Sequence, residues 1–438
     1  MGKVRQGTPV RPALRWCGHF HSAVLFLIVI SACLLELNGE TLVFPPYGHS
    51  YGIRKATPQH LFMFFGPRTF FDNPQGLATT RLDVWDDPKT EKDDDEVVVY
   101  GVNCNRHQII YNTSMWTLGL YGKRGNGEGC FLYPRGVAAD RHGNVIVADS
   151  GNDRVVVLYN PKSSLKWVRT IDGAASGMTL KGPTQVGIDE ALRIYITDTG
   201  NRRVLRCTLE GKVLGSIECS APPTALAVAD GEAYWSFFRN EQALFFAEGK
   251  NVLVKTDFSG KPLIKATLPS GYAASYGAID FYHNYWITDS ANCVVIKYDH
   301  NLNLLDIFGS CGTGDNQFVE PRGIAIYKRY GQTFIAEKKG AQYYWVGTDL
   351  KSAKLSVDPD TSRYTLTVSA TEYSFVSLFS IINADTCFYM KKHRIPPGNA
   401  VLGIRGKGHD LRAEKMMLKL EPTYSSYTYY SWFFPVGF

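Results

Sequence analysis

The sequence predicts an all-β protein: a six-bladed β-propeller followed by a small antiparallel β domain, for which an immunoglobulin-like sandwich is one candidate. Two observations predict the propeller. A motif recurs at intervals of about 40–50 residues, and each copy contains short apolar or β-branched runs separated by Gly, Asn and Asp turns. Four short strands in a repeat of that length form one propeller blade. A third observation sets the boundary of the β domain, because the repeat ends near Gly347 and further strand-like runs follow.

The repeat is clearest at residues 134–155, where Pro-Arg-Gly-Val-Ala-Ala-Asp leads into the strand Val-Ile-Val-Ala-Asp and the turn Ser-Gly-Asn. Five other copies follow the same order and are recognised from Pro74, Pro183, Pro223, Tyr285 and Pro321. The residue that ends the second strand is acidic in five copies: Asp149, Asp198, Glu248, Asp289 and Glu337. The same position in the first copy is assigned to Gly101. The six copies predict six blades.

The recurring turn has a local physical explanation. Gly and Asn tolerate positive φ, and the Asp carboxylate can accept hydrogen bonds from N–H groups of the turn. We therefore expect the repeated turn residues to be structural rather than catalytic: Asp149, Asn152, Asp198, Asn201, Asp289 and Asn292.

These motifs resemble the NHL-repeat family. The resemblance covers roughly residues 60–347 and is strongest in the copies at 134, 183 and 321, whereas the copy at 223 lacks the Gly-Asn turn. It implies a closed propeller. Together with the leader described below, it is similar to the bacterial exported lipoproteins that carry such a propeller.

We expect four segments: a leader at 1–37, a linker at 38–57, the propeller at 58–349 and a β-sandwich-like domain at 350–438. Residues 61–65 follow the pattern of the final strands of later units. We expect them to form the outer strand of the last blade beside residues 343–346, because joining the ends removes the exposed edges of an open array. The aromatic segment 427–438 is expected to be the last strand of the β domain.

The leader has the composition of an export signal. Its basic residues come first: Lys3, Arg5, Arg11 and Arg15. The apolar run Ala23 to Leu35 follows and is shorter than the ~20 residues of a membrane-spanning helix. Ile-Ser-Ala-Cys at 30–33 resembles a lipobox, in which the Cys is lipidated. We expect an extracytoplasmic protein, periplasmic or on the cell surface, anchored through Cys33; the alternative is an ordinary signal peptide and a secreted protein.

Composition and charge limit the classes of partner. The chain has 45% hydrophobic and 20% charged residues, which suits a folded protein and excludes intrinsic disorder. The net charge of +6 arises from 47 basic and 41 acidic residues, but four of the basic residues lie in the leader. Cleavage before Cys33 would leave a nearly neutral protein, so the charge does not indicate a nucleic-acid partner.

The cysteines allow two disulfides. No CxxC pair is present, which argues against zinc-ribbon or thioredoxin-like chemistry. Cys207 and Cys219 flank a short turn between expected strands, and Cys293 and Cys311 are similarly placed. Either pair could be bonded in an exported protein, and buried free thiols are the alternative for both.

Propellers bind ligands at the mouth of the channel, where we expect the starts of the inner strands to converge. The residue after the recurring Pro marks this ring: Gln75, Arg135, Thr184, Thr224, Ser275 and Arg322. Ser275 is assigned by pattern because its copy lacks the Pro. The two arginines could hold a carboxylate or phosphate through bidentate hydrogen bonds; alternatively, each packs against backbone carbonyls across the channel.

The resemblance implies two kinds of enzyme site: NHL-type lyases hold a metal with His, and calcium-dependent propeller lactonases use Asp, Glu and Asn. The expected ring offers neither set, so we expect no metal, no cofactor and no catalytic residue there. His107 stands alone and is expected to be a satisfied structural residue. The acidic segment 85–96 could chelate calcium or form a solvated loop.

These observations predict a non-enzymatic binding or scaffold propeller for a protein, peptide or glycan ligand. The alternative is a propeller enzyme, lyase-like or lactonase-like, with its site at the channel mouth.

Overall fold

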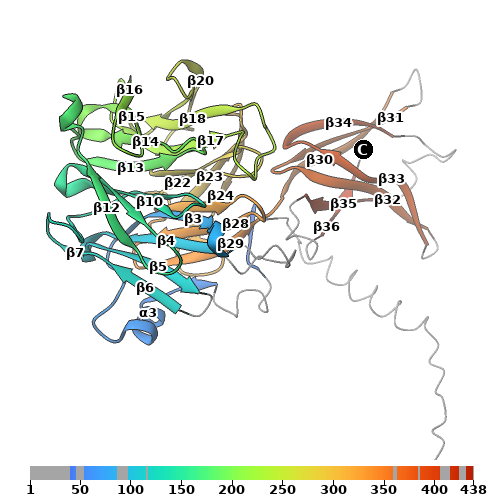
Figure 1. Ribbon diagram of the computed structural model, residues 1–438. Coiled ribbons are helices and arrows are strands. Elements are labelled where there is room, and N and C mark those ends of the chain that lie inside the picture. The colour runs from blue at the N-terminus through green and yellow to red at the C-terminus, as the bar shows by residue number, and fades with distance from the viewer. Residues whose placement is uncertain are drawn as a thin grey trace, which may run out of the picture.

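The computed structural model describes residues 40–45, 54–85, 97–114, 117–358, 363–382, 385–404, 415–423 and 431–437. Within these ranges the chain is almost entirely β, and its one α-helix is α3 (Pro58–Phe65). Figure 1 shows a ring of sheets and, beside it, a smaller β domain formed by the C-terminal part of the chain. The all-β propeller prediction is confirmed.

The described residues form six sheets in the ring. The first three blades, each of four antiparallel strands, are β3 (Pro74–Arg81), β4 (Val97–Asn103), β5 (Gln108–Ser114) and β6 (Thr117–Tyr121); β9 (Val137–Ala139), β10 (Asn144–Asp149), β11 (Arg154–Tyr159) and β12 (Lys166–Ile171); and β13 (Pro183–Ile188), β14 (Arg193–Asp198), β15 (Arg203–Thr208) and β16 (Val213–Glu218).

The remaining blades complete the circle. They are β17 (Pro223–Asp230), β18 (Gln242–Glu248), β19 (Val252–Asp257) and β20 (Pro262–Thr267); β21 (Tyr276–Ile279), β22 (Tyr285–Asp289), β23 (Val294–Tyr298) and β24 (Leu304–Phe308); and β27 (Ile324–Tyr327), β28 (Gln332–Glu337) and β29 (Gly340–Val346) with β1 (Leu42–Val43) and β2 (Lys55–Ala56). The inner strands contact one another in the order β3, β9, β13, β17, β21, β27 and back to β3. The ring is therefore closed.

The N-terminal part of the chain closes the ring, but not through the predicted segment. Residues 61–65 belong to helix α3, so the predicted outer strand there is wrong. The outer position beside β29 is filled by β1 and β2, from the segment 38–57 that was expected to be a linker; Leu42 pairs with Val346, and Lys55 with Gln342. The helix forms because Pro58 stands at its first position and Thr57 and His60 form a capping box.

Neighbouring blades bury both faces of the central strands. Residues 145–148 of β10 and 155–158 of β11 are at most 1% exposed, and they pack with the second strand of the next blade through residues such as Ile194 and Ile196. A strand covered on both faces is apolar throughout instead of alternating. This explains the continuous Val, Ile and Ala runs of the repeat.

A polar side chain at the end of the second strand fixes the entrance to each blade. It accepts a hydrogen bond from a backbone N–H just before the inner strand in five blades: Asp72 to Asn103 (2.8 Å), Leu132 to Asp149 (2.7 Å), Lys181 to Asp198 (2.7 Å), Ala273 to Asp289 (2.7 Å) and Val319 to Glu337 (2.9 Å). In the fourth blade the Ser220 hydroxyl donates to Glu248 (2.6 Å).

In the first blade, the assignment of the recurring acidic position to Gly101 is wrong. Asn103, and not Gly101, occupies the position of the recurring Asp, because β3 pairs Pro74 with Asn103 as β13 pairs Pro183 with Asp198. The spacing of this position from one blade to the next varies from 41 to 50 residues, whereas the first two strands pair in the same register in the blades that begin with Pro74 and Pro183.

The repeated turns are built around the same carboxylates. An Asn amide donates to the Asp three residues earlier in each turn: Asn152 to Asp149 (2.8 Å), Asn201 to Asp198 (2.8 Å) and Asn292 to Asp289 (2.7 Å). The Nε atoms of Arg154 and Arg203 add a hydrogen bond of 2.8 Å each to Asp149 and Asp198. The three carboxylates are fully buried.

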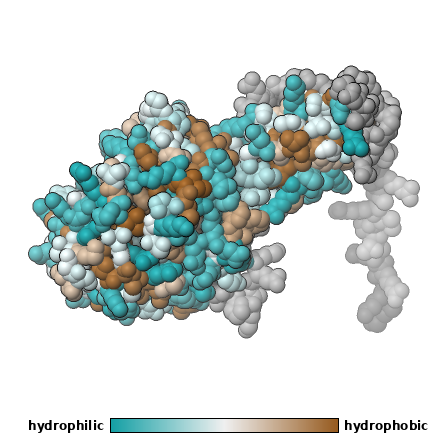
Figure 2. Space-filling model, turned by 90° about the horizontal axis from the view of Figure 1, so that it is seen from above, coloured by the Kyte–Doolittle hydropathy of each residue, from teal (hydrophilic) through white to brown (hydrophobic). Residues whose placement is uncertain are grey.

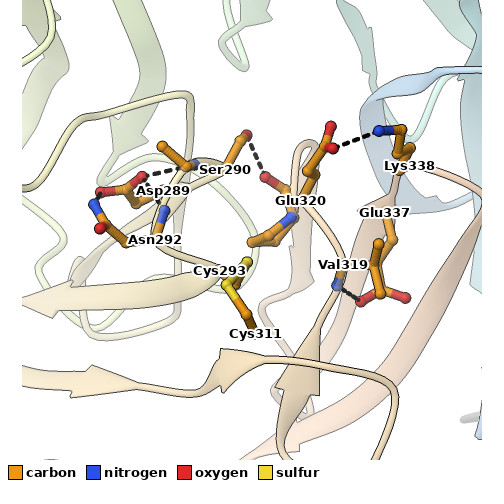
Figure 3. The surroundings of a disulfide bond; sticks show 11 residues. Asp289, Ser290, Asn292, Cys293, Cys311, Val319, Glu320, Glu337 and Lys338 are labelled. Carbon is orange, nitrogen blue, oxygen red and sulfur yellow. Dashed lines mark hydrogen bonds and ion pairs between the residues drawn. A yellow bond between two sulfur atoms is a disulfide. The ribbon is translucent and has the colours of Figure 1, made fainter.

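Cys293 and Cys311 form a disulfide with a Cα–Cα distance of 4.9 Å. Figure 3 shows it beside the Asp289–Asn292 turn, so it crosslinks that turn to the loop carrying β25 (Ser310–Cys311) and β26 (Gln317–Phe318). Cys207 and Cys219 are free thiols. The backbone N–H of Cys219 donates to Arg202, which places Cys219 at the far end of the β15–β16 hairpin from Cys207.

The C-terminal domain consists of two sheets. The strands in chain order are β30 (Leu350–Val357), β31 (Tyr364–Ala370), β32 (Ser374–Ile382), β33 (Asp385–Ile395), β34 (Gly398–Ile404), β35 (Met416–Pro422) and β36 (Trp432–Val436). One sheet has the order β30-β31-β34 and the other β33-β32-β35-β36, with a shared core that includes Leu355, Leu366 and Leu418. In a constant-type immunoglobulin domain the fourth strand pairs in the sheet of the first, second and fifth strands. Here the fourth strand, β33, pairs with β32 in the other sheet, and the remaining strands keep the immunoglobulin order. Strand β36 lies within the predicted segment 427–438.

The domain docks on the fifth blade through a buried ion pair. Lys297 Nζ lies 2.6 Å from Glu372 Oε2, and the two side chains are 1% and 0% exposed. Lys297 also lies over the Trp286 ring, 4.5 Å from its centroid, and Tyr282 stacks on Tyr373. Seen from above, the domain projects from the ring as a separate lobe (Figure 2). The contact between the propeller and the C-terminal domain is therefore built around this buried ion pair.

Removing one partner of this pair should be more destabilising than removing both. We expect Lys297→Met alone, or Glu372→Gln alone, to lower the free energy of unfolding by about 3–5 kcal/mol, because the remaining polar or charged group stays buried without its partner. The double variant Lys297→Met with Glu372→Leu should recover much of that loss. The free energy of unfolding can be measured by urea unfolding followed by tryptophan fluorescence, since Trp286 and Trp432 belong to the adjoining core. Additive losses would contradict the interpretation.

Candidate functional site

A cavity of about 370 Å³ occupies one end of the central channel. Every inner strand lines it: residues 77–81, 137–139, 186–188, 226–228, 277–279 and 324–327. The wall exposes about as much polar as apolar surface, and the volume is within the usual range for small-ligand sites. Because the loops between first and second strands also line it, the cavity opens at the C-terminal ends of the inner strands.

Charged side chains from those loops surround the opening: Arg81, Asp83, Asp140, Arg141, His142, Asp189, Glu190, Asp230 and Lys328. Several are paired across blades. His142 Nδ1 lies 2.9 Å from Asp83, and Arg141 lies 3.6 Å from Asp83 and 3.5 Å from Glu190. The pairs hold the loops of the first three blades in fixed positions.

Lys328 differs from its neighbours at this opening. No described residue forms a hydrogen bond or ion pair with it, and its side chain is half-buried. Burial lowers the pKa of Lys328, although the carboxylates of Asp230 and Glu190 oppose the shift. Burial also raises the pKa of Glu190, against the effect of Arg141. An amine and a carboxyl whose pKa values are shifted beside one cavity are typical of a functional site.

Aromatic side chains stand next to Lys328. Tyr234 and Trp235, from the loop between β17 and β18, line the cavity, and Tyr234 is 62% exposed. The Arg329 guanidinium lies 5.0 Å from the Trp235 ring centroid. The opening therefore combines an unpaired cation with an aromatic surface.

A buried polar network fixes that loop. The Ser236 hydroxyl lies 2.7 Å from His283 Nε2, and His283 Nδ1 lies 2.5 Å from Glu241 Oε2. Lys255 also donates to Glu241. Burial alone would raise the pKa of Glu241, but hydrogen bonds from His283, His300 and Lys255 outweigh it and lower the pKa. Burial lowers the pKa of His283, which favours the neutral ring.

The order Ser236, His283, Glu241 is that of an acyl-transfer triad. However, Ser236 is 3% exposed and does not line the cavity. In this conformation the network is a structural support for the loop that carries Trp235.

The ring predicted from the sequence lies at the other end of the channel, and none of its six residues lines the cavity. At that end of the channel, side chains one residue after the predicted ring positions form hydrogen bonds between blades. Gln185 donates to the Ser275 carbonyl and accepts from the Leu226 N–H (both 2.7 Å), and the Tyr276 hydroxyl donates to Gln75 (2.7 Å). This end of the channel is therefore narrowed by Gln185 and Tyr276.

The predicted ring residues are mostly engaged locally. Arg322 pairs with Glu320 at 2.9 Å, and Arg135 is exposed. The three hydroxyl residues contact neighbouring hydroxyl or carbonyl groups: Thr184 with Thr197 and Thr199, Thr224 with Gly249, and Ser275 with Ser290. The two arginines do approach one region, since both charges act on the pKa of Tyr276, which burial raises.

The remaining residues singled out from the sequence are His107, Cys33 and the acidic segment 85–96. His107 accepts a hydrogen bond from the Tyr133 N–H (3.0 Å) and is 6% exposed. Cys33 and most of the acidic segment, residues 86–96, lie outside the described residues. In the described part of the chain there is no group of three or more His, Cys, Asp or Glu placed to hold a metal, and no helix with the length and apolarity needed to cross a membrane.

Sequence reasoning missed the charged opening because it examined the starts of the inner strands. A signal was present after their ends, where Asp-Arg-His at 140–142, Asp-Glu at 189–190 and Tyr-Lys at 327–328 stand at equivalent points of three repeats. The isolated position of Lys328 depends on which neighbours pair, and this requires the three-dimensional arrangement.

A comparison with protein families agrees with the repeat. Residues 131–158 match the NHL repeat model. Among solved structures, a streptogramin B lyase has 15% identity and a TM-score of 0.43, covering 63% of this chain and 95% of that one. A gluconolactonase from Xanthomonas campestris has 11% identity and a TM-score of 0.46, covering 70% and 95%. At this level the similarity says nothing about the activity of this chain. A comparison with curated proteins gives no match.

Lys328 should titrate below an ordinary lysine. After reductive ¹³C-methylation, we expect the dimethyl-lysine NMR signal of Lys328 to titrate at a lower pH than a dimethylated lysine peptide, because burial disfavours the charged amine. That signal should be missing from Lys328→Met, which assigns it. A Lys328 signal that titrates at or above the midpoint of the peptide would contradict the description of the site.

Proposed function

We propose that this NHL-repeat propeller is an exported, membrane-tethered binding module that holds an acidic group of a peptide or glycan ligand in the channel cavity. The observation that carries the proposal is the unpaired amine of Lys328 at the opening of a cavity of about 370 Å³. An unpaired, partly desolvated cation is a strong partner for a carboxylate.

The rest of the opening suits such a ligand. Tyr234 and Trp235 offer aromatic faces on which an apolar side chain or a sugar ring can stack. Glu190 stands on the same rim and can accept hydrogen bonds from N–H or O–H groups of the ligand. A ligand with a carboxylate next to an apolar or sugar group would satisfy both sides.

Two observations support export. The basic segment and apolar run at the start of the chain have the composition of a signal, with Cys33 in a lipobox-like context. The Cys293–Cys311 disulfide is typical of an oxidising compartment.

Binding can be tested with matched pairs of probes: acetyl-Ala-Ala-Phe with a free or an amidated C-terminus, and glucuronate against glucose. We expect calorimetry to detect the carboxylate member of at least one pair, and Lys328→Met to weaken it at least tenfold, because the loss of a charge-assisted hydrogen bond removes about 1.5–3 kcal/mol. Trp235→Ala should also weaken it.

The control is the other end of the channel. Arg135→Ala with Arg322→Ala should leave binding unchanged. Equal affinity for carboxylate and neutral members, or loss of binding in the arginine variant alone, would contradict the proposed site.

An enzyme remains the second candidate because of the Ser236–His283–Glu241 arrangement. If the loop opens, Ser236 could attack an acyl carbon while His283 takes its proton. A fluorophosphonate probe followed by peptide mapping tests this. Labelling of Ser236 that is lost in His283→Gln would favour the enzyme; unlabelled Ser236 would leave the network with its structural role.

A further inference from the structure

An exposed apolar patch lies on helix α3 and the loop after it. Three consecutive side chains point away from the protein: Phe62, Met63 and Phe64 are 53%, 78% and 46% exposed. Phe70 adds a fourth large side chain at 41% exposure. Large exposed apolar side chains gathered in one short segment mark an interaction site more often than scattered single residues do.

The helix is built to present these side chains. The Thr57–His60 capping box starts it, and Gly66 ends it with an N–H donated to the Phe62 carbonyl at 2.8 Å. Leu61 is the buried residue of the helix. One buried side chain and two caps therefore hold the helix against the ring while its apolar face stays outside the core. In Figure 1, α3 projects from the edge of the propeller.

The surroundings of the patch are basic. Arg68 and Arg106 are exposed, and the Arg106 guanidinium lies 4.7 Å from the Phe70 ring centroid and donates to the Arg68 carbonyl at 3.2 Å. The sequence contains no acidic residue between Glu40 and Asp72. The first acid after this stretch is Asp72, two residues beyond Phe70. An apolar surface next to two cations is complementary to an anionic bilayer, in which Phe and Met enter the interface and Arg meets the headgroups.

We propose that the α3 patch, defined as Phe62, Met63, Phe64 and Phe70 with Arg68 and Arg106, docks on an anionic lipid surface. This inference rests on the membrane location in the proposed function and is independent of the cavity ligand. It supplies a second attachment to the surface that the lipid on Cys33 would already hold.

The length of the chain before the ring agrees with this occupant. Leu42 is nine positions after Cys33, so a lipid on Cys33 can lie no more than about 30 Å from β1, at ~3.3–3.6 Å per residue. Strands β1 and β2 both pair with β29, and α3 begins two residues after β2. The segment that carries the anchor and the helix that carries the patch are thus both attached to the outer edge of the last blade. A tethered propeller presents this outer edge near the bilayer.

Hydrogen exchange on the full chain locates the contact. We expect peptides covering residues 57–70 to exchange several-fold more slowly with vesicles of 70% phosphatidylcholine and 30% phosphatidylglycerol than without vesicles. Vesicle co-sedimentation of the variant Phe62→Ser with Met63→Ser and Phe64→Ser should show at least tenfold weaker binding. Arg68→Gln with Arg106→Gln should reduce the preference for anionic over pure phosphatidylcholine vesicles several-fold.

A matched control removes exposed apolar side chains elsewhere. Val168→Ser with Leu263→Ser and Leu304→Ser changes residues that are 46%, 50% and 45% exposed on the outer strands of three other blades, and it should leave vesicle binding unchanged. Equal losses in both triple variants would overturn the inference. So would protection of 57–70 that rises with protein concentration in the absence of lipid, since this would make the occupant a second copy of the chain.

The anchor is tested separately by labelling with a radioactive fatty acid, with Cys33→Ala as the control. Protection of 57–70 without Cys33-dependent labelling would support the patch and remove the proposed tether. Labelling without protection of 57–70 would overturn the patch and leave the tether in place.

Discussion

The hydrogen bond that ends each second strand is the interaction on which the propeller depends. In five blades it joins the acceptor to a backbone N–H in the loop that enters the blade, as from Leu132 to Asp149 and from Lys181 to Asp198. A buried N–H without an acceptor costs about 1–3 kcal/mol, so the bond fixes where the inner strands of these blades begin. The acceptor may be Asp, Glu or Asn, because the geometry requires an oxygen and not a particular charge.

Close packing at the start of the inner strands follows from this constraint. A Cβ atom on Gly76 would lie 2.7 Å from the Arg135 carbonyl, and one on Gly323 would lie 2.2 Å from the Gln75 carbonyl. Neighbouring backbones therefore touch at this end. Where the repeat carries a longer side chain instead of Gly, at Gln185 and Tyr276, that side chain spans the channel. The opposite end keeps the open volume, which is why the cavity lies beside Glu190 and Lys328.

The C-terminal domain supports a loop that forms part of the wall of that opening. The loop that carries Trp235 also carries Phe237, whose ring packs on Tyr373 and lies 5.1 Å from the Arg394 guanidinium. The Lys297–Glu372 pair holds the domain in this position. The cavity wall is thus supported on one side by the Ser236–His283–Glu241 network and on the other by Tyr373 of the C-terminal domain, more than 130 residues later in the chain.

The sequence by itself determined the all-β fold, the repeat and the residues of its turns, because strand patterning and an Asp-x-x-Asn turn are local properties. It also indicated that the ring must be closed by the N-terminal part of the chain. Only the tertiary structure decided which segment does so, since β1 and β2 are each two residues long and too short to leave a periodic pattern. It likewise decided which end of the channel is open and which cation is unpaired. Lys328, Glu190 and Trp235 come from three blades, and their proximity depends on the closure of the ring.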